Sequence, residues 1–186
     1  MIISFSGAQS SGKTTLLNKM QTLYPEYAYV PEVTRLVKRL YGLSINEAGD
    51  DLTQLAIISQ HLHNILLHRG KNHTVIMDRC SLDGVVYTQW LYDQGKVNLQ
   101  TVMSANNVFR QTIELYDTIF YTNPRDVNIE DDGERSTDVK FREEIIELFD
   151  FYMKDFKHKI IVLNGTVEER LQQIKQHLQK NNINIK

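Results

Sequence analysis

The chain has 186 residues, of which 41% are hydrophobic and 24% charged, and its formal net charge is −2 at pH 7. This composition is typical of one globular domain, and its slight acidity argues against nucleic acid or an anionic membrane as a partner. A single cysteine, Cys80, excludes an internal disulfide. The chain enters an apolar strand without a basic leader and has no apolar stretch near the ~20 residues that span a membrane, so we expect a cytoplasmic protein.

An apolar run at residues 2–6 predicts the first strand, and residues 15–24 have the pattern of a helix. Between them lies the sequence GAQSSGKT, residues 7–14, which fits the G-x-x-x-x-G-K-[ST] phosphate-binding loop. Gly7 and Gly12 allow tight turns that aim successive backbone N–H groups at a triphosphate, and the helix adds its positive end. The chain is therefore expected to bind a nucleoside triphosphate.

Two side chains of this loop have expected roles. Lys13 is expected to reach the β- and γ-phosphates, and the Thr14 hydroxyl is expected to bind Mg²⁺. The expected nucleotide-binding residues are Gly7, Ser10, Ser11, Gly12, Lys13, Thr14 and Thr15.

Apolar runs and helical patterns then alternate along the chain. The expected strands after the first are residues 27–30, 74–77, 118–121 and 160–163. Helical spacing predicts helices at 31–41, from Asp50 or Asp51 to about Gly70, at 82–93, 99–115 and 139–156, and from Thr166 onward. Short buried strands separated by helices predict an α/β fold with a five-stranded parallel sheet and helices on both faces. No linker or repeat divides the chain, so we expect a single domain, residues 1–186.

Glu32 directly follows the second expected strand, in the sequence VPEVTR. In doubly wound sheets this edge faces the ligand crevice. A carboxylate there is placed to take the proton of an acceptor hydroxyl, and Arg35 one turn later is placed to orient the acceptor. The alternative is that Pro31-Glu32 only begins a helix, whose dipole the acid favours.

The third expected strand runs into Asp78 and Arg79, in VIMDR. An acid at this edge, beside the phosphate loop, can hold Mg²⁺ directly or through water. The alternative is a purely structural acid. Arg79 is a candidate for clamping an anionic or polar substrate, or is an ordinary salt-bridge partner.

Residues 123–137 contain Pro, Asn, Gly and many charges, and we predict a mobile loop there. Arg135, together with Arg125 or Arg142, is a candidate to close over the triphosphate, exclude water and neutralise developing charge. The expected lid spans about 123–142. The alternative is a solvated acidic surface.

For several other residues, the spacing along the chain predicts only structural roles. His61, His63 and His68 lie on one expected helix without metal-binding i, i+4 pairing, and we expect them at the surface or its boundary. Tyr87 and Trp90 are expected in the core, with the alternative that either lines a pocket for a planar ring.

Five segments, in order, carry a family resemblance. They are GAQSSGKTTL, PEVTRLVKRLYG, the long helix with Gln54 and Gln60, MDRCSLDGVVYTQW and EDDGERSTDVKFREEI. This order resembles the small P-loop kinases. It is more narrowly similar to the nicotinamide riboside kinase domain of bifunctional bacterial NAD-salvage proteins and to relatives in an AAA-named ATPase family. The likeness covers residues 1 to about 178, and the Asp132-Gly133-x-Arg135-Ser136 segment followed by Arg142 is what narrows it.

The chain also departs from these patterns. Asp78-Arg79 at the end of the third strand resembles thymidylate kinases, whereas deoxynucleoside kinases have Glu-Arg there and a general-base Glu after strand two. This analogy makes Glu32 the base candidate and Asp78 the metal ligand. The chain contains no adenylylating domain, so it resembles only the kinase half of the bifunctional proteins.

Together these features imply an ATP- and Mg²⁺-dependent kinase that transfers the γ-phosphoryl group to nicotinamide riboside or a (deoxy)nucleoside. The expected catalytic residues are Lys13, Glu32, Asp78 and Arg135. The expected acceptor-binding residues are Glu32, Arg35, Arg79 and Asp83, and the expected metal ligands are Thr14 and Asp78. Three alternatives stay open: a thymidylate-type nucleoside monophosphate kinase, a kinase of a modified nucleotide in DNA, and an ATP-hydrolysing switch without a small acceptor.

Overall fold

The structure is a computed structural model that describes residues 1–127 and 138–180. Its strands form one parallel sheet in the order β2-β3-β1-β4-β5. The strands are β1 (Ile2–Ser6), β2 (Ala28–Val30), β3 (Val75–Asp78), β4 (Thr118–Thr122) and β5 (Ile160–Leu163). The helices are α1 (Lys13–Leu23), α2 (Val33–Tyr41), α3 (Asp51–His68), α4 (Ser81–Asp93), α5 (Leu99–Thr112), α6 (Val139–Met153) and α7 (Val167–Lys180). The expected five-stranded parallel α/β fold is confirmed.

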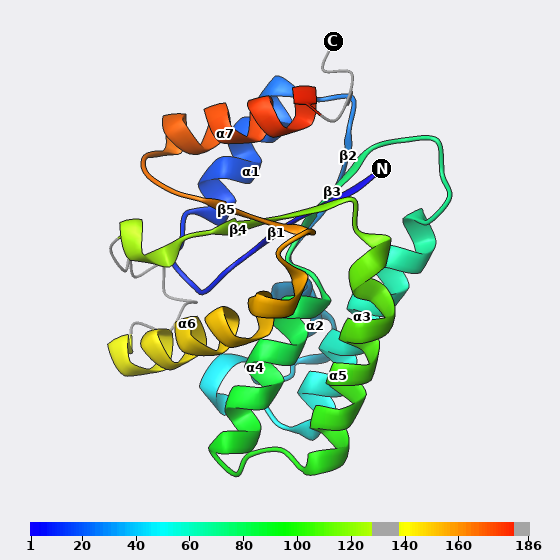
Figure 1. Cartoon of the computed structure of the whole chain (residues 1–186). Helices are drawn as coiled ribbons and strands as arrows, with labels where there is room; N and C mark the ends of the chain where they lie inside the picture. Colours follow the sequence, from blue (N-terminus) through cyan, green and yellow to red (C-terminus); the bar gives the residue numbers. More distant parts are fainter. Residues whose placement is uncertain (128–137, 181–186) are drawn as a thin grey trace.

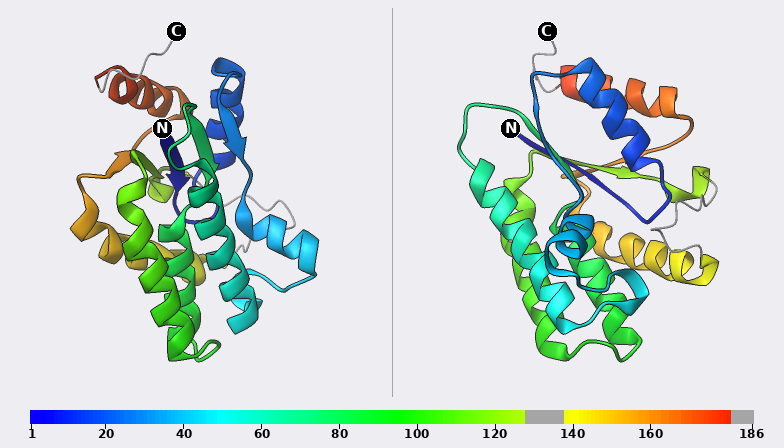
Figure 2. Two further views of the ribbon diagram at one scale, coloured as in Figure 1. Left: turned by 90° about the vertical axis from the view of Figure 1, so that its right-hand side faces the viewer. Right: turned by 180° about the vertical axis from the view of Figure 1, so that it is seen from behind.

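Helices cover both faces of this sheet (Figures 1 and 2). Helices α1 and α7 lie on one face, and α3, α4, α5 and α6 lie on the other. Strand β1 at the centre is buried along its whole length. Its residues alternate between the two cores, so Ile3 and Phe5 pack with Leu16 of α1, whereas Ile2 packs on the opposite side.

The strand register brings three functional segments to the same edge of the sheet. Phe5 of β1 pairs with Asp78, the last residue of β3, and Val30 of β2 pairs with Met77. Because all strands are parallel, their carboxyl ends meet at one edge. The phosphate loop after β1, the segment after β2 and the end of β3 therefore lie together.

Element boundaries depart little from the prediction, and the departures have local causes. Asp50 caps α3, because its side chain accepts a hydrogen bond of 2.8 Å from the backbone N–H of Thr53. Helices α5 and α6 end earlier than expected because each continues as a 3₁₀ turn, Ile113–Leu115 and Lys154–Phe156.

Two further expectations concern the loop after β4 and membrane-spanning helices. The predicted mobile loop at 123–137 begins with a 3₁₀ turn, Pro124–Asp126, and residues 128–137 lie outside the described residues. Within the described ranges, no helix combines the length and the apolar character needed to cross a membrane.

Candidate active site

The loop of residues 7–12 turns on backbone angles that favour glycine. Gly7 and Gly12 have φ angles of 139° and 87°, and Ser10 between them has φ of 52°. A Cβ on Gly7 would lie 2.8 Å from Oγ1 of Thr122 and 2.9 Å from its carbonyl oxygen, so β4 leaves no room for a side chain. Ser11 is bound to the same neighbour, since its hydroxyl lies 2.6 Å from Oγ1 of Thr122. These contacts fix the loop against β4 just before α1 begins.

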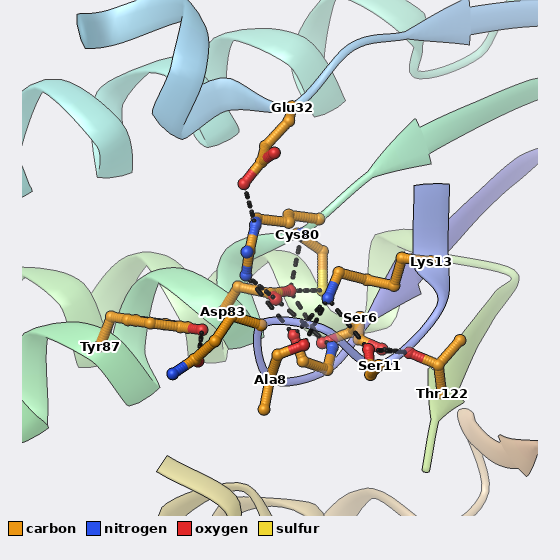
Figure 3. Close-up of polar contacts among 12 residues, drawn as sticks. Ser6, Ala8, Ser11, Lys13, Glu32, Cys80, Asp83, Tyr87 and Thr122 are labelled. Carbon is orange, nitrogen blue, oxygen red and sulfur yellow. Dashed lines mark hydrogen bonds and ion pairs between the residues drawn. The ribbon is translucent and has the colours of Figure 1, made fainter. Parts of the chain in front are cut away.

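The ammonium group of Lys13 lies inside this loop (Figure 3). Its Nζ donates hydrogen bonds to the carbonyl oxygens of Gly7 and Ala8, both at 2.7 Å, and to Oγ of Ser11 at 3.2 Å. Burial, and next the charge of Arg79, lower the pKa of Lys13 to about 7, although nearby carboxylates oppose this shift. A positive group held among the loop's backbone is the arrangement that binds phosphate.

An unpartnered carboxylate oxygen lies beside the start of α1. Oδ1 of Asp78 is buried and has no hydrogen-bond partner in the described part of the chain. Burial, and next the carboxylate of Glu32, raise the pKa of Asp78 to about 6. Asp78, Glu32 and the exposed Thr14 line one cleft between α1 and α2.

This donor set fits Mg²⁺. A carboxylate and a hydroxyl are hard oxygen donors, and Mg²⁺ in kinases takes its remaining ligands from water and substrate phosphates. Residues 1–127 and 138–180 contain no cluster of three or more His, Cys, Asp or Glu side chains that would hold a metal by themselves.

Arg79 joins two carboxylates at the same edge of the sheet. Its Nε lies 2.6 Å from Oε1 of Glu32, and its Nη1 lies 3.1 Å from Oδ1 of Asp83. Its guanidinium carbon lies 5.3 Å from the ring centre of Tyr87. Burial disfavours the charge, but Glu32 and the other acids outweigh it and raise the pKa of Arg79. Arg79 is thus an ion-pair partner that also lines a pocket, and its role in clamping a substrate stays a prediction.

Glu32 is the residue directly before α2, but its carboxylate does not cap the helix. It makes no hydrogen bond to the helix backbone, and its Oε2 lies 3.0 Å from Nε of Arg35. Burial raises the pKa of Glu32, but Arg79, Lys13 and Arg35 together outweigh burial, and the net shift is downward. Glu32 is therefore ionised at neutral pH and held between two guanidinium groups.

Asp83 connects the phosphate loop to Arg79. Only 2% of Asp83 is exposed, and its carboxylate accepts hydrogen bonds from Oγ of Ser6 at 2.7 Å and from the backbone N–H of Cys80 at 3.1 Å (Figure 3). The N–H of Gly7 also donates to it, at 3.4 Å. Asp83 lines the same pocket as Arg79, but its oxygens are occupied by protein groups, and its role in binding the acceptor stays a prediction.

The expected lid arginines are placed differently. Arg125 is exposed and pairs with Asp150 of α6 at 2.8 Å. Arg142 is buried and donates to the carbonyl oxygens of Pro124 and Val127, the latter at 2.7 Å. Both guanidinium groups are bound to other parts of the chain, and the lid role of these two arginines stays a prediction. Arg135 lies outside the described residues.

Sequence reasoning missed Arg170, the most buried charged residue of α7. Only 1% of it is exposed, and it donates to the carbonyl oxygens of Ser11 at 2.7 Å, Gly165 at 2.9 Å and Asn123 at 2.8 Å. It therefore ties the phosphate loop to the ends of β4 and β5. Its spacing from the buried Ile174 and Leu178 was the available signal, because the arginine falls on the apolar face of the helix.

Replacing Arg170 by methionine is expected to lower the free energy of unfolding by about 3 kcal/mol, because three carbonyl groups lose a buried charged donor. Urea unfolding of the variant measures this difference. Arg110→Met, on the exposed side of α5, is the control and should change it by less than about 0.5 kcal/mol. An Arg170 variant as stable as that control would contradict the tying role.

The expectation for His61 needs correction, whereas Trp90 lies in the core as expected. His61 is buried rather than at the surface, with 3% exposure, whereas His63 is exposed and His68 is half-buried. Trp90 packs on Phe141, with ring centres 4.5 Å apart, so of the two aromatic candidates it is Tyr87 that lines a pocket.

Comparisons with solved structures show the same fold in nucleoside and nucleotide kinases. A deoxyadenosine kinase from M. mycoides superposes with a TM-score of 0.69 at 14% identity, over 97% of this chain and all of that one. A thymidylate kinase from Candida albicans superposes with a TM-score of 0.69 at 15% identity, over 98% of this chain and 92% of that one. NadR in complex with NR superposes with a TM-score of 0.72 at 16% identity, over 100% of this chain and 52% of that one. The chain therefore spans about half the length of NadR.

Sequence comparison gives the family. No curated protein matches the chain. The AAA domain family matches residues 2–170, which includes the phosphate loop, β3 with Asp78 and the start of α7. On this match and the shared P-loop kinase fold, the chain belongs to the AAA domain family.

Proposed function

We propose that residues 1–186 form one kinase domain that transfers the γ-phosphoryl group of ATP, with Mg²⁺, to a hydroxyl of a nucleoside-like small molecule. The observation that carries this proposal is the grouping of Lys13, Asp78 and Glu32 at one edge of the sheet, in a phosphate loop and the cleft beside it. The shared fold with nucleoside and nucleotide kinases supports the reaction class.

In the proposed reaction the loop N–H groups and Lys13 bind the β- and γ-phosphates. Thr14 and Asp78 would hold Mg²⁺, which would neutralise charge on the phosphates when bound. The acceptor oxygen forms a bond to the γ-phosphorus while the bond to the β–γ bridging oxygen breaks, and ADP leaves. Arg135 is proposed to add positive charge from the lid.

Glu32 is proposed to orient the acceptor hydroxyl and accept its proton. Its pKa is lowered by Arg79, so it is a weak base. Phosphoryl transfer passes through a loose transition state, in which the nucleophile needs little activation before the phosphoryl group arrives. A weak but well-placed carboxylate is therefore sufficient, and positioning by Arg79 and Arg35 is its main requirement.

The ion pairs favour an acceptor hydroxyl without a neighbouring phosphate. A nucleoside monophosphate kinase would use Arg79 and Arg35 to grip the acceptor's phosphate. Both arginines are paired with Glu32, at 2.6 and 3.0 Å, so a phosphate would have to displace this carboxylate.

The proposal is tested by ATP consumption with Mg²⁺ against nicotinamide riboside, nucleosides, nucleoside monophosphates and single-stranded DNA, with product masses. One nucleoside that gains a single phosphate, far faster than the acceptor-free background, would support the proposal. Phosphorylation of a monophosphate or of DNA would show that this compound, and not a nucleoside, is the acceptor. Slow ATP hydrolysis that no acceptor changes would indicate an ATP-driven switch instead.

Replacing Glu32 by glutamine is expected to lower kcat for transfer about a hundredfold to a thousandfold, with ATP affinity unchanged, because the acceptor loses its proton acceptor. Steady-state kinetics with the best acceptor of the panel measure this. Glu26→Gln, an exposed acid just before β2, is the matched control and should leave kcat unchanged. A Glu32 variant within threefold of the parent would exclude the base role.

A further inference from the structure

A narrow pocket lies between α3 and α4, next to the proposed catalytic edge. Its lining includes Gln54, Ile57 and His61 of α3, and Arg79, Gly84 and Tyr87 at or near α4. Arg79 reaches from this pocket to Glu32, so the pocket adjoins the proposed acceptor hydroxyl. The open volume of the pocket is about 20 Å³, enough for a single water molecule, so a ring that enters it must first move these side chains apart and then contacts them directly.

His61, which lines this pocket, has a buried polar atom without a partner among the described residues. Only 3% of His61 is exposed, and its Nε2 has no hydrogen-bond partner in the described part of the chain. Gly84 faces it without a side chain, and a Cβ there would lie 3.4 Å from Cδ2 of His61. A buried polar atom without a partner costs stability, so a side chain of this kind in a pocket points to a ligand that completes it.

The surroundings decide what kind of ligand atom fits. Burial lowers the pKa of His61 to about 4, although Asp83 opposes this, so the imidazole is neutral at neutral pH. A neutral imidazole has one donor and one acceptor nitrogen, which complement an uncharged edge of ring nitrogens, amines or carbonyls. Gln54 is already oriented beside it, since its Oε1 accepts a hydrogen bond of 3.0 Å from Thr88.

We infer that His61 determines which acceptor is used, by hydrogen-bonding through Nε2 to the polar edge of the acceptor's planar heterocycle. This inference rests on the proposed kinase function and adds the recognition of the acceptor ring. Ile57 and the ring of Tyr87 supply the apolar contact for the faces of such a heterocycle. A site built to hydrogen-bond a ring edge rejects an analogue that lacks this edge, because the protein group is then left unpaired.

The test compares His61 variants with the best nucleoside acceptor and with a nucleoside that carries an apolar isostere of its ring. His61→Leu is expected to raise the KM for the natural acceptor about tenfold to a hundredfold and to leave the KM for the isostere and for ATP within twofold. His61→Gln, whose amide reaches the place of Nε2, should retain most of the affinity. His63→Leu, exposed on the same helix, is the control and should change nothing.

Stability gives a readout that separates recognition from folding. His61→Leu removes an unpartnered polar atom, so its melting temperature should equal or exceed that of the parent while acceptor affinity falls. If this variant does not fold, His61→Asn, whose amide stops short of Nε2, is expected to show the same loss of affinity. Unchanged KM values and acceptor ranking in the folded variants would overturn the inference and leave the kinase proposal intact. A parent protein that phosphorylates no nucleoside would instead overturn the kinase proposal.

Discussion

Replacing Lys13 by methionine is expected to reduce ATP-dependent phosphoryl transfer roughly a thousandfold or more, because the γ-phosphoryl group loses the positive charge inside the loop. Methionine keeps most of the aliphatic stem of the buried side chain, so the fold should be retained. The hydrogen bonds of Nζ to the carbonyl oxygens of Gly7 and Ala8 are lost. Rates of product formation with saturating acceptor measure the effect, and far-ultraviolet circular dichroism checks folding.

Lys19→Met provides the matched control for this experiment. Lys19 lies on the same helix, α1, but is exposed and pairs with Glu168 at 2.6 Å, away from the loop. Its replacement should change the transfer rate by less than twofold. A folded Lys13 variant whose rate stays within tenfold of the parent would show that the phosphates bind elsewhere.

Replacing Asp78 by asparagine is expected to have two opposite effects. Transfer should fall about a hundredfold or more at saturating Mg²⁺, because the metal loses a carboxylate ligand. Stability at pH 8 should rise by about 3 kcal/mol, because the folded parent holds a carboxylate that burial and Glu32 disfavour.

The pH dependence of this gain follows from the direction of the shift. Asp78 has a pKa of about 6 in the folded protein and an ordinary, lower pKa when unfolded, so the folded state binds the proton more tightly. The difference in stability between variant and parent should be absent below about pH 4, grow between about pH 4 and 6, and stay constant above. Urea unfolding at pH 4, 5, 6 and 8 measures it. A difference that does not change with pH would contradict the raised pKa.

The positions of the main elements follow from the sequence because local signals specify them. Each strand is a short apolar run between helix patterns or turn residues, and parallel pairing then places the ends of β1, β2 and β3 at one edge. The phosphate loop, Glu32 and Asp78 therefore meet as predicted. The position of these residues just after a strand was enough to predict where they lie in the fold.

The residues that the sequence misplaced depend on contacts between distant segments. The burial of His61 depends on α4, where Gly84 supplies no side chain opposite it. Arg170 is buried because carbonyl groups of Ser11, Asn123 and Gly165 converge on it from three loops. Helical spacing treats both residues as ordinary polar positions, so it cannot identify such partners.

An unbroken series of polar contacts joins the two proposed substrate sites. It runs from the N–H of Gly7 to Asp83, from Asp83 to Arg79 and from Arg79 to Glu32, with distances of 3.4, 3.1 and 2.6 Å. If ATP binding shifts the loop, these contacts would carry the change to the carboxylate proposed to face the acceptor. Thermodynamic linkage makes this coupling reciprocal, so the factor by which ATP changes acceptor affinity equals the factor by which the acceptor changes ATP affinity.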